Sequence, residues 1–257
     1  MTLNEYLVMY YTILRKEIVR VLRIWPQSLI PSVITMTLYF LVFGKIIGSR
    51  VGTMGGFDYI SFITPGLIIM AVVNNAYSNV VGSFYGSRFS QAIQELLVSP
   101  VTNNIIILGY VSGGILRGSV IGVLVCIVAS LFGAFHVYSI WLLIVAFIFC
   151  SGLFALGGLL NGIFSQSFDD TMIFPTFILT PLIYLGGTFY DIKLLPAPWH
   201  EIALFNPVFY IVDLFRYACL GVSEVDPLWS FTAVVIFCAI LYGIILYCLN
   251  RGIRLKP

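Results

Sequence analysis

The sequence predicts an all-α membrane protein with six transmembrane helices in a single domain, residues 1–257. Apolar residues make up 60% of the chain and charged residues 9%, whereas soluble domains average about 25% charged residues. The mean hydropathy is +1.03. A bilayer core of about 30 Å needs about 20 apolar helical residues. The stretches that meet or approach this length are 27–47, 60–82, 105–133, 139–163, 171–188 and 228–249.

Before the first span, residues 3–24 predict an amphipathic helix that lies in the membrane interface. Apolar side chains recur on one side of this helix, and basic side chains lie largely on the others. The apolar set is Leu7, Tyr11, Leu14, Ile18, Val21 and Leu22, and the basic set is Arg15, Lys16, Arg20 and Arg23. The charges also interrupt any apolar run of the kind found in a cleavable signal peptide.

The distribution of Lys and Arg predicts that both termini are cytoplasmic. Six spans place the termini on one side, and basic residues flank that side twice as often as the other, which is the positive-inside pattern. The first group is Arg15, Lys16, Arg20, Arg23, Arg88, Arg251, Arg254 and Lys256, and the second is Lys45, Arg50, Lys193 and Arg216.

Between the second and third spans, residues 86–100 (GSRFSQAIQELLVSP) predict a water-exposed amphipathic helix. Its apolar residues recur at i, i+4, i+7 and i+8. They are Phe89, Ile93, Leu96 and Leu97, and the polar side carries Arg88, Gln91, Gln94 and Glu95. The charge distribution places this helix in the cytoplasm, where it either docks a partner or lies on the membrane as a solvated connector.

The third span carries several glycines and one arginine. Small residues four apart let helices approach closely in lipid, which indicates packing within one subunit, with a dimer face as the alternative. These glycines are Gly109, Gly113, Gly114, Gly118 and Gly122, and the fourth span adds Gly157, Gly158 and Gly162. Arg117 lies about 18 Å along its helix from Ile105. A charge at that depth faces protein or water, so Arg117 either contacts substrate or has a structural role.

The fifth span begins with a capping pattern. Ser167 is a favourable N-cap, and Asp169 and Asp170 in the first turn face free N–H groups and the positive end of the helix dipole. The alternative role for these acids is a salt bridge to a cytosolic partner. Pro175 and Pro181 interrupt the span, which is tolerated where neighbouring groups satisfy the freed carbonyls.

Between the fifth and sixth spans, residues 191–222 predict re-entrant or interfacial helices on the outer side. Asn206 and Pro207 form a good helix start, and Gly221 is a good stop. The roughly 14 apolar residues between them are too few to cross the bilayer. Asp213 and Arg216, three residues apart, are placed to neutralise each other.

Several function classes lack support in the sequence. No phosphate-binding loop is present, since Gly44-Lys45 is followed by Ile46. No zinc-protease or serine-hydrolase motif occurs, and the cysteines show no metal-ligand spacing, so we interpret them as small core residues. The net charge of +2 gives no electrostatic support for nucleic-acid binding.

Five stretches in a fixed order carry a resemblance to a known family. They are ITMTLYFLVFGKIIGSR (34–50), ITPGLIIM (63–70), QELLVSPV (94–101), FDDTMIFPTFILTPLIYLGGTFY (168–190) and FNPVFYIVDLFRYACLG (205–221). Together they resemble the ABC-2 type transporter permeases, especially the inner-membrane permeases of bacteria. QELLVSPV and NPVFYIVDLFRYACLG are more specific than the hydrophobic runs.

The resemblance implies a homodimeric permease with one separate ATP-binding subunit per copy, two in all. ATP and magnesium would be bound by that partner, with no cofactor on this chain. It implies that the helix at 86–100 is a coupling helix docking the ATPase through Arg88, Phe89, Ile93, Glu95, Leu96 and Leu97. Spans one and five would line the dimer seam and the transport route, with Tyr39, Phe43, Phe177 and Tyr184 facing the seam. Facing lipid is the alternative for these four residues.

The function expected on this basis is export of a hydrophobic or amphipathic substrate, such as a drug, lipid or lipid-linked glycan, across the bacterial cytoplasmic membrane. No span offers a row of charges, which favours such a cargo. The alternatives are an ATP-independent channel or secondary transporter, and a non-transporting membrane scaffold or sensor.

Overall fold

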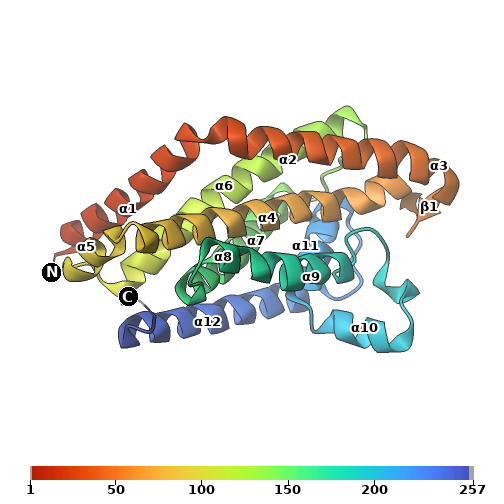
Figure 1. Ribbon diagram of the computed structural model, residues 1–257. Helices are drawn as coiled ribbons and strands as arrows, with labels where there is room; N and C mark the ends of the chain where they lie inside the picture. The colour runs from red at the N-terminus through yellow and green to blue at the C-terminus, as the bar shows by residue number, and fades with distance from the viewer. Residues whose placement is uncertain (1, 255–257) are drawn as a thin grey trace.

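The computed structural model describes residues 2–254 and shows a bundle of long helices (Figure 1). Lys256, one of the basic residues used to orient the chain, lies outside the described residues. Six helical segments are long and apolar enough to cross a membrane, in agreement with the six predicted spans. The chain is therefore a multi-pass helical membrane protein.

The first half of the described chain contains three spans. Helix α1 covers Leu3–Arg23, and the first span runs through α2 (Trp25–Tyr39), the π-helix η1 (Phe40–Ile47) and α3 (Gly48–Val51). A two-residue hairpin of β1 (Thr53–Met54) and β2 (Phe57–Asp58) leads into α4 (Tyr59–Phe89), the second span. The short helix α5 (Ala92–Val98) and the third span α6 (Asn103–Leu131) follow.

The second half contains three more spans. Helix α7 (Ile140–Phe164) is the fourth, and the fifth is divided into α8 (Phe168–Phe174), the π-helix η2 (Pro175–Leu179) and α9 (Thr180–Leu185). A 3₁₀ turn η3 (Ile192–Leu194), α10 (Ala197–Leu204) and α11 (Pro207–Leu220) precede the sixth span, α12 (Pro227–Arg251). Helices α10 and α11 are bent by 81° at Phe205–Asn206, which matches the predicted break before Pro207.

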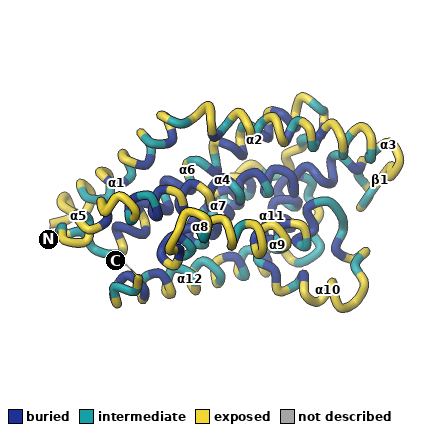
Figure 2. Tube along the Cα trace, viewed as in Figure 1, coloured by how far each residue is buried: buried dark blue, intermediate teal, exposed yellow. Residues whose placement is uncertain are grey.

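Helix α4 forms the centre of the bundle, and the first and fifth spans lie at its periphery. In the most apolar stretch of α4, 83% of the residues are buried, against 11% in that of the first span and 17% in that of the fifth. Figure 2 shows the same contrast, with buried residues concentrated along α4 and exposed ones along α2, α8 and α9. The two outer spans therefore present large apolar surfaces to lipid or to another protein.

The glycines of the third and fourth spans bring helices together within the chain, as the sequence predicts. A Cβ atom on Gly109 or Gly113 would lie within 3 Å of Ile13 or Glu17, so these two glycines receive α1. A Cβ on Gly158 would lie 2.5 Å from the carbonyl oxygen of Tyr77. Such close backbone contact gives membrane helices favourable van der Waals packing in the absence of a hydrophobic driving force.

The predicted start of the fifth span is confirmed. The Ser167 hydroxyl accepts a hydrogen bond from the Asp170 N–H at 3.1 Å, and the Asp170 carboxylate accepts one from the Ser167 N–H at 3.0 Å. This reciprocal arrangement satisfies N–H groups that the first helical turn leaves free.

Candidate functional site

The helix predicted at 86–100 is divided in two. Helix α4 continues through Arg88 and Phe89, and the chain then turns at Gln91, which has a φ of 59°. A left-handed conformation is uncommon for a residue other than glycine, and it redirects the chain so that α5 begins only at Ala92. Figure 1 places α5 at the same end of the molecule as both described termini.

The predicted docking residues lie in three different environments. Phe89 and Leu97 are exposed, as is the neighbouring Val98, which is 86% exposed. Ile93 is instead only 3% exposed, in a cluster with side chains from α1, α4 and α6. Leu96 is partly buried against the same cluster, and Glu95 is exposed. The free apolar surface of this end is therefore smaller than the sequence suggests and includes Val98.

Arg88 is bonded to its own chain. Its Nη1 atom donates to the carbonyl oxygens of Gly162, Ile163 and Ser165 at 2.8–2.9 Å. These carbonyls lie at the C-terminal end of α7, where four carbonyl groups lack intrahelical partners and the helix dipole favours a cation. Arg88 thus fastens the end of α4 to the end of α7.

A polar network joins α1 to α4 and α6. The Glu17 carboxylate is completely buried, and it accepts hydrogen bonds from Arg20 at 2.9 Å and from the Ser83 hydroxyl. Arg20 also donates to the main-chain and side-chain oxygens of Asn79 at 2.8 Å. One turn of α1 earlier, Lys16 donates to Ser87 at 3.0 Å. The sequence assigned these charges to a surface helix, but one side of that helix is held against the bundle.

Arg117 faces the same region from α6. Its two Nη atoms point toward the side-chain oxygens of Asn79 and Asn75 at 3.5 and 3.3 Å, and its buried Nε atom has no partner among the described residues. These contacts are long for hydrogen bonds to a charged donor. Arg117 therefore faces protein, as expected for a deep charge, and its hydrogen bonds to Asn75 and Asn79 are weak.

Three of the four predicted seam residues meet around Phe189, which follows the fifth span. Ring centroids of Tyr39, Phe43 and Tyr184 lie 4.9–6.1 Å from that of Phe189. These are distances at which aromatic pairs attract, so the first and fifth spans are joined at the end of the molecule opposite α5. The fourth residue, Phe177, is 74% exposed on η2.

The buried charges of α11 are satisfied differently from the prediction. Arg216 forms its ion pair with Glu224 at 3.0 Å, and not with Asp213, and it donates to the Gly187 carbonyl at 2.8 Å. The Asp213 carboxylate accepts from the Glu224 N–H at 2.7 Å and the Ser230 hydroxyl at 2.9 Å. The turn at Gly221, with a φ of 75°, brings Glu224 back to the helix.

The N-terminus of α11 is capped as predicted. The Asn206 side chain accepts a hydrogen bond from the Val208 N–H at 2.9 Å, and Pro207 occupies the first helical position. The Asn206 amide also donates to the Leu182 carbonyl at the end of the fifth span, at 2.6 Å. This second bond links the start of α11 to α9.

Among the described residues, six apolar helices, two of them largely exposed, together with a bent helix pair define a multi-pass helical membrane protein. Residues 9–220 match the family model described as ABC-2 type transporter. Over 254 residues, 99% of both chains, the sequence is 47% identical to "Inner membrane transport permease YadH" of Escherichia coli strain K12. It is also 26% identical to "Nodulation protein J" of Rhizobium leguminosarum bv. viciae, over 77% of this chain and 78% of that one. The chain belongs to the ABC-2 type transporter family, which confirms the resemblance.

Proposed function

We propose that the chain is the permease subunit of an exporter driven by a separate ATP-binding subunit. The substrate class is hydrophobic or amphipathic, which includes drugs, lipids and lipid-linked glycans. We further propose that two copies of the permease form a homodimer in the bacterial cytoplasmic membrane, with both termini in the cytoplasm. The E. coli relative is named as an inner membrane transport permease, which supports this membrane and this activity.

The exposed apolar surface on and beside α5 is the observation that carries the proposal. Phe89, Leu97 and Val98 are 69%, 38% and 86% exposed at an end of the molecule that also holds both described termini. If the termini are cytoplasmic, this surface lies beyond the ends of the spans, where a partner protein can cover it. Exposed apolar side chains on a short helix fit a groove on a partner protein. The partner we propose is the ATPase, because the chain has no phosphate-binding loop of its own.

The test replaces Leu97 and Val98 by aspartate, singly and together. Each loss of a buried apolar anchor should weaken binding by about 2 kcal/mol, or about thirtyfold. Co-purification of the ATP-binding subunit and substrate-stimulated ATP hydrolysis should therefore both fall. Ile93→Asp is unsuitable, because Ile93 is buried and its replacement would disturb folding.

The matched control is Leu194→Asp. Leu194 is 69% exposed in η3, at the opposite end of the molecule, so the partner should still be retained. Equal retention by Leu97→Asp, Val98→Asp and the double variant would contradict docking at α5. Transport by the reconstituted permease without any ATPase would instead support an ATP-independent channel or secondary transporter.

A further inference from the structure

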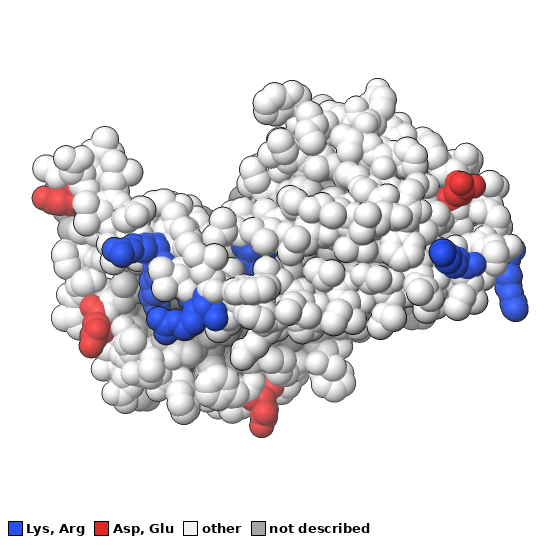
Figure 3. Space-filling model, turned by 90° about the horizontal axis from the view of Figure 1, so that it is seen from above, with Lys and Arg blue, Asp and Glu red and all other residues white. Residues whose placement is uncertain are grey.

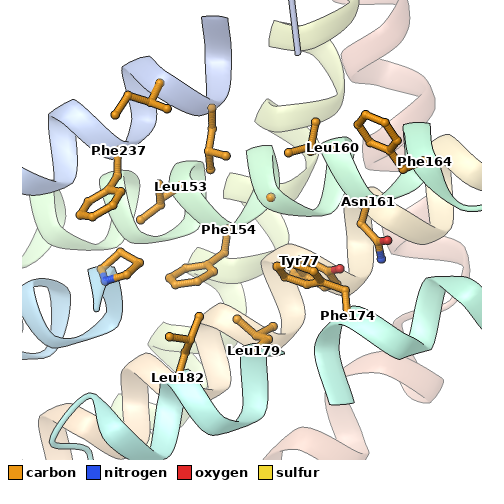
Figure 4. A pocket seen from close by; sticks show the side chains of 14 residues that line it. Tyr77, Leu153, Phe154, Leu160, Asn161, Phe164, Phe174, Leu179, Leu182 and Phe237 are labelled. Atoms are coloured by element: carbon orange, nitrogen blue, oxygen red, sulfur yellow. The ribbon is translucent and has the colours of Figure 1, made fainter. Parts of the chain in front are cut away.

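An apolar cavity lies between the fourth, fifth and sixth spans. Its volume is about 430 Å³, within the range of about 300–1,000 Å³ that small-molecule sites occupy. Figure 4 shows Leu153 and Phe154 of α7, Leu182 of the fifth span and Phe237 of α12 around it. Because all three helices are membrane spans, lipid surrounds the part of the molecule that holds this cavity.

One end of the cavity holds an unpartnered hydroxyl group. Tyr77 is 1% exposed, its ring stacks on Phe174 with centroids 5.8 Å apart, and its Oη atom has no hydrogen-bond partner among the described residues. The nearby Asn161 amide donates one N–H to the Thr171 carbonyl and its oxygen accepts from Ser165, so it keeps one N–H and one oxygen lone pair, with which a ligand would compete for the Tyr77 hydroxyl. A buried hydroxyl without a partner is unfavourable, so an acceptor brought by a ligand would stabilise this arrangement.

A second recess of about 360 Å³ continues the cavity toward the ends of the spans. The two share Asn161, Phe164 and Phe174 in their walls, and the second adds Arg254. Arg254 donates one hydrogen bond, from Nη1 to the Phe164 carbonyl at 3.0 Å, which leaves its other N–H groups for a ligand. Asp170 also borders the recess; its carboxylate accepts hydrogen bonds from the main chain at the start of α8 and stays charged, so a ligand phosphate would share Arg254 with it.

The polar groups are arranged in the order of those in a phospholipid. Asn161 lies three residues before the end of α7, about 4.5 Å along the axis, so the Tyr77 hydroxyl is near the end of the spans. Leu153 lies eight residues further in, about 12 Å along the helix. From the outside inward, the site therefore presents a guanidinium, a hydroxyl donor and an apolar channel, which complement a phosphate, an ester carbonyl and an acyl chain.

We propose that this cavity binds one acyl chain of a phospholipid from the leaflet on the α5 side. The phosphate faces Arg254, the ester carbonyl accepts a hydrogen bond from Tyr77, and the chain lies between α7, α9 and α12. The site lies within one copy of the chain and does not depend on the ATP-driven mechanism proposed above.

The test uses the full-length protein in nanodiscs that contain phosphatidylglycerol with a photoactivatable group on one acyl chain. Labelled positions are mapped by mass spectrometry, and diacylglycerol with the same acyl chains is the probe without phosphate. We expect phospholipid labelling at Phe154, Leu182 and Phe237. Tyr77→Phe should reduce it about fivefold, the effect of losing one hydrogen bond of ordinary strength, and Arg254→Gln should reduce it about tenfold or more, because that bond is made to a charged phosphate. The diacylglycerol probe should label weakly and respond to Tyr77→Phe alone.

Two glycine substitutions distinguish lipid bound in the cavity from lipid that only surrounds the protein. Gly157 lines the cavity, and a Cβ atom there would make an ordinary contact of 3.9 Å with the Tyr77 ring, so the side chain of Gly157→Leu would take up space in the cavity. Gly243 on α12 has no atom within 4 Å of such a Cβ, so Gly243→Leu is the matched control. Cavity labelling should fall at least tenfold in the first variant and stay unchanged in the second.

Labelling that is equal on all exposed spans and insensitive to Gly157→Leu would overturn the proposal and indicate annular lipid only. Equal labelling by diacylglycerol and phosphatidylglycerol would overturn the part assigned to Arg254. Thermal unfolding in detergent provides the control for folding. Tyr77→Phe should leave the midpoint unchanged or raise it, because the change breaks no hydrogen bond within the described chain and removes a buried hydroxyl.

Discussion

Glu17 shows that a pattern of charges along a helix does not predict which charged side chains are buried. Periodicity placed α1 correctly, but it described a helix lying in the interface, whereas the Glu17 carboxylate is fully buried against α4. Burial of this group follows from the space that Gly113 leaves on α6, a contact between residues about a hundred positions apart. Similarly, Arg216 has its partner eight residues away across a turn, at Glu224, where helical spacing gives no signal.

The network around Glu17 predicts unequal effects of two arginine substitutions. Arg20→Gln leaves a buried carboxylate without its cation and should lower the unfolding free energy by about 3 kcal/mol or more. Arg117→Gln removes only the long contacts to Asn75 and Asn79 and should cost less than about 1 kcal/mol. Thermal unfolding of the purified protein measures both, with the exposed Arg15→Gln as control. Equal losses from the two substitutions would contradict this assignment.

Glu224 predicts a dependence of stability on pH. Burial, together with the neighbouring Asp191 and Asp213, raises the pKa of Glu224 to about 7 despite the opposing charges of Arg216 and Lys193. The folded state therefore binds the proton more tightly than the unfolded state. This contribution to stability is complete below the ordinary pKa of 4.5 and is lost as the pH rises through about 7.

Unfolding midpoints of the wild-type protein and Glu224→Gln, measured between pH 5 and 8, check this sign. The amide keeps an oxygen to accept from Arg216 but cannot lose a proton, so the variant should show a smaller decline in stability over this range. A decline of the same size in both proteins would assign the titration to another group.

At the scale of elements, hydropathy identified the spans well and their ends less well. The six spans depend on composition over 20 residues, and that signal is strong in this chain. The end of α4 depends instead on Arg88 reaching the carbonyls of α7, and the break before α5 depends on one left-handed residue, Gln91. Neither the contact nor the conformation has a periodic signature, so the sequence predicted one longer helix.

The close approach of α4 and α7 predicts a strong dependence on Gly158. In Gly158→Ala, the new methyl group would lie 2.5 Å from the backbone oxygen of Tyr77, so the two helices must separate. Overpacking of this kind costs about 1–3 kcal/mol. Gly243→Ala meets no atom within 4 Å and should be neutral or stabilising by up to about 1 kcal/mol. Unfolding midpoints of the two alanine variants provide the comparison. An unchanged midpoint for Gly158→Ala would show that α4 and α7 can separate slightly without losing stability.

At the scale of the whole molecule, charged side chains are few. On the face in Figure 3, one group of basic side chains extends from one end toward the middle and a second lies at the other end, with a surface without charge between them, as expected for a protein embedded in lipid. The sequence could predict this arrangement because charge and hydropathy are read directly. It could not predict Phe189 as the centre of the aromatic cluster, since that residue follows a glycine pair in a turn and only the fold brings it to Tyr39 and Phe43.

The proposed dimer predicts which seam residues contact the second copy. Phe177 is exposed on η2, whereas Phe43 is partly buried against Phe189. A cysteine at position 177 should therefore give an intersubunit cross-link in membranes, and one at position 43 should give much less. Val123 on α6 is 54% exposed, and Val123→Cys tests for random collisions. Absence of a product from Phe177→Cys, or equal yields from positions 177 and 123, would count against this seam.

The length of α4 has a mechanical consequence. Its 31 residues extend about 46 Å at 1.5 Å per residue, which exceeds the bilayer core of about 30 Å. Its far end is anchored, since the Tyr59 hydroxyl donates to the Phe189 carbonyl at 3.2 Å and Gly66 abuts the backbone of Thr188. If the proposed partner docks beside Phe89, a tilt of α4 would move Tyr59 and, through its hydrogen bond, Phe189 at the opposite end of the molecule.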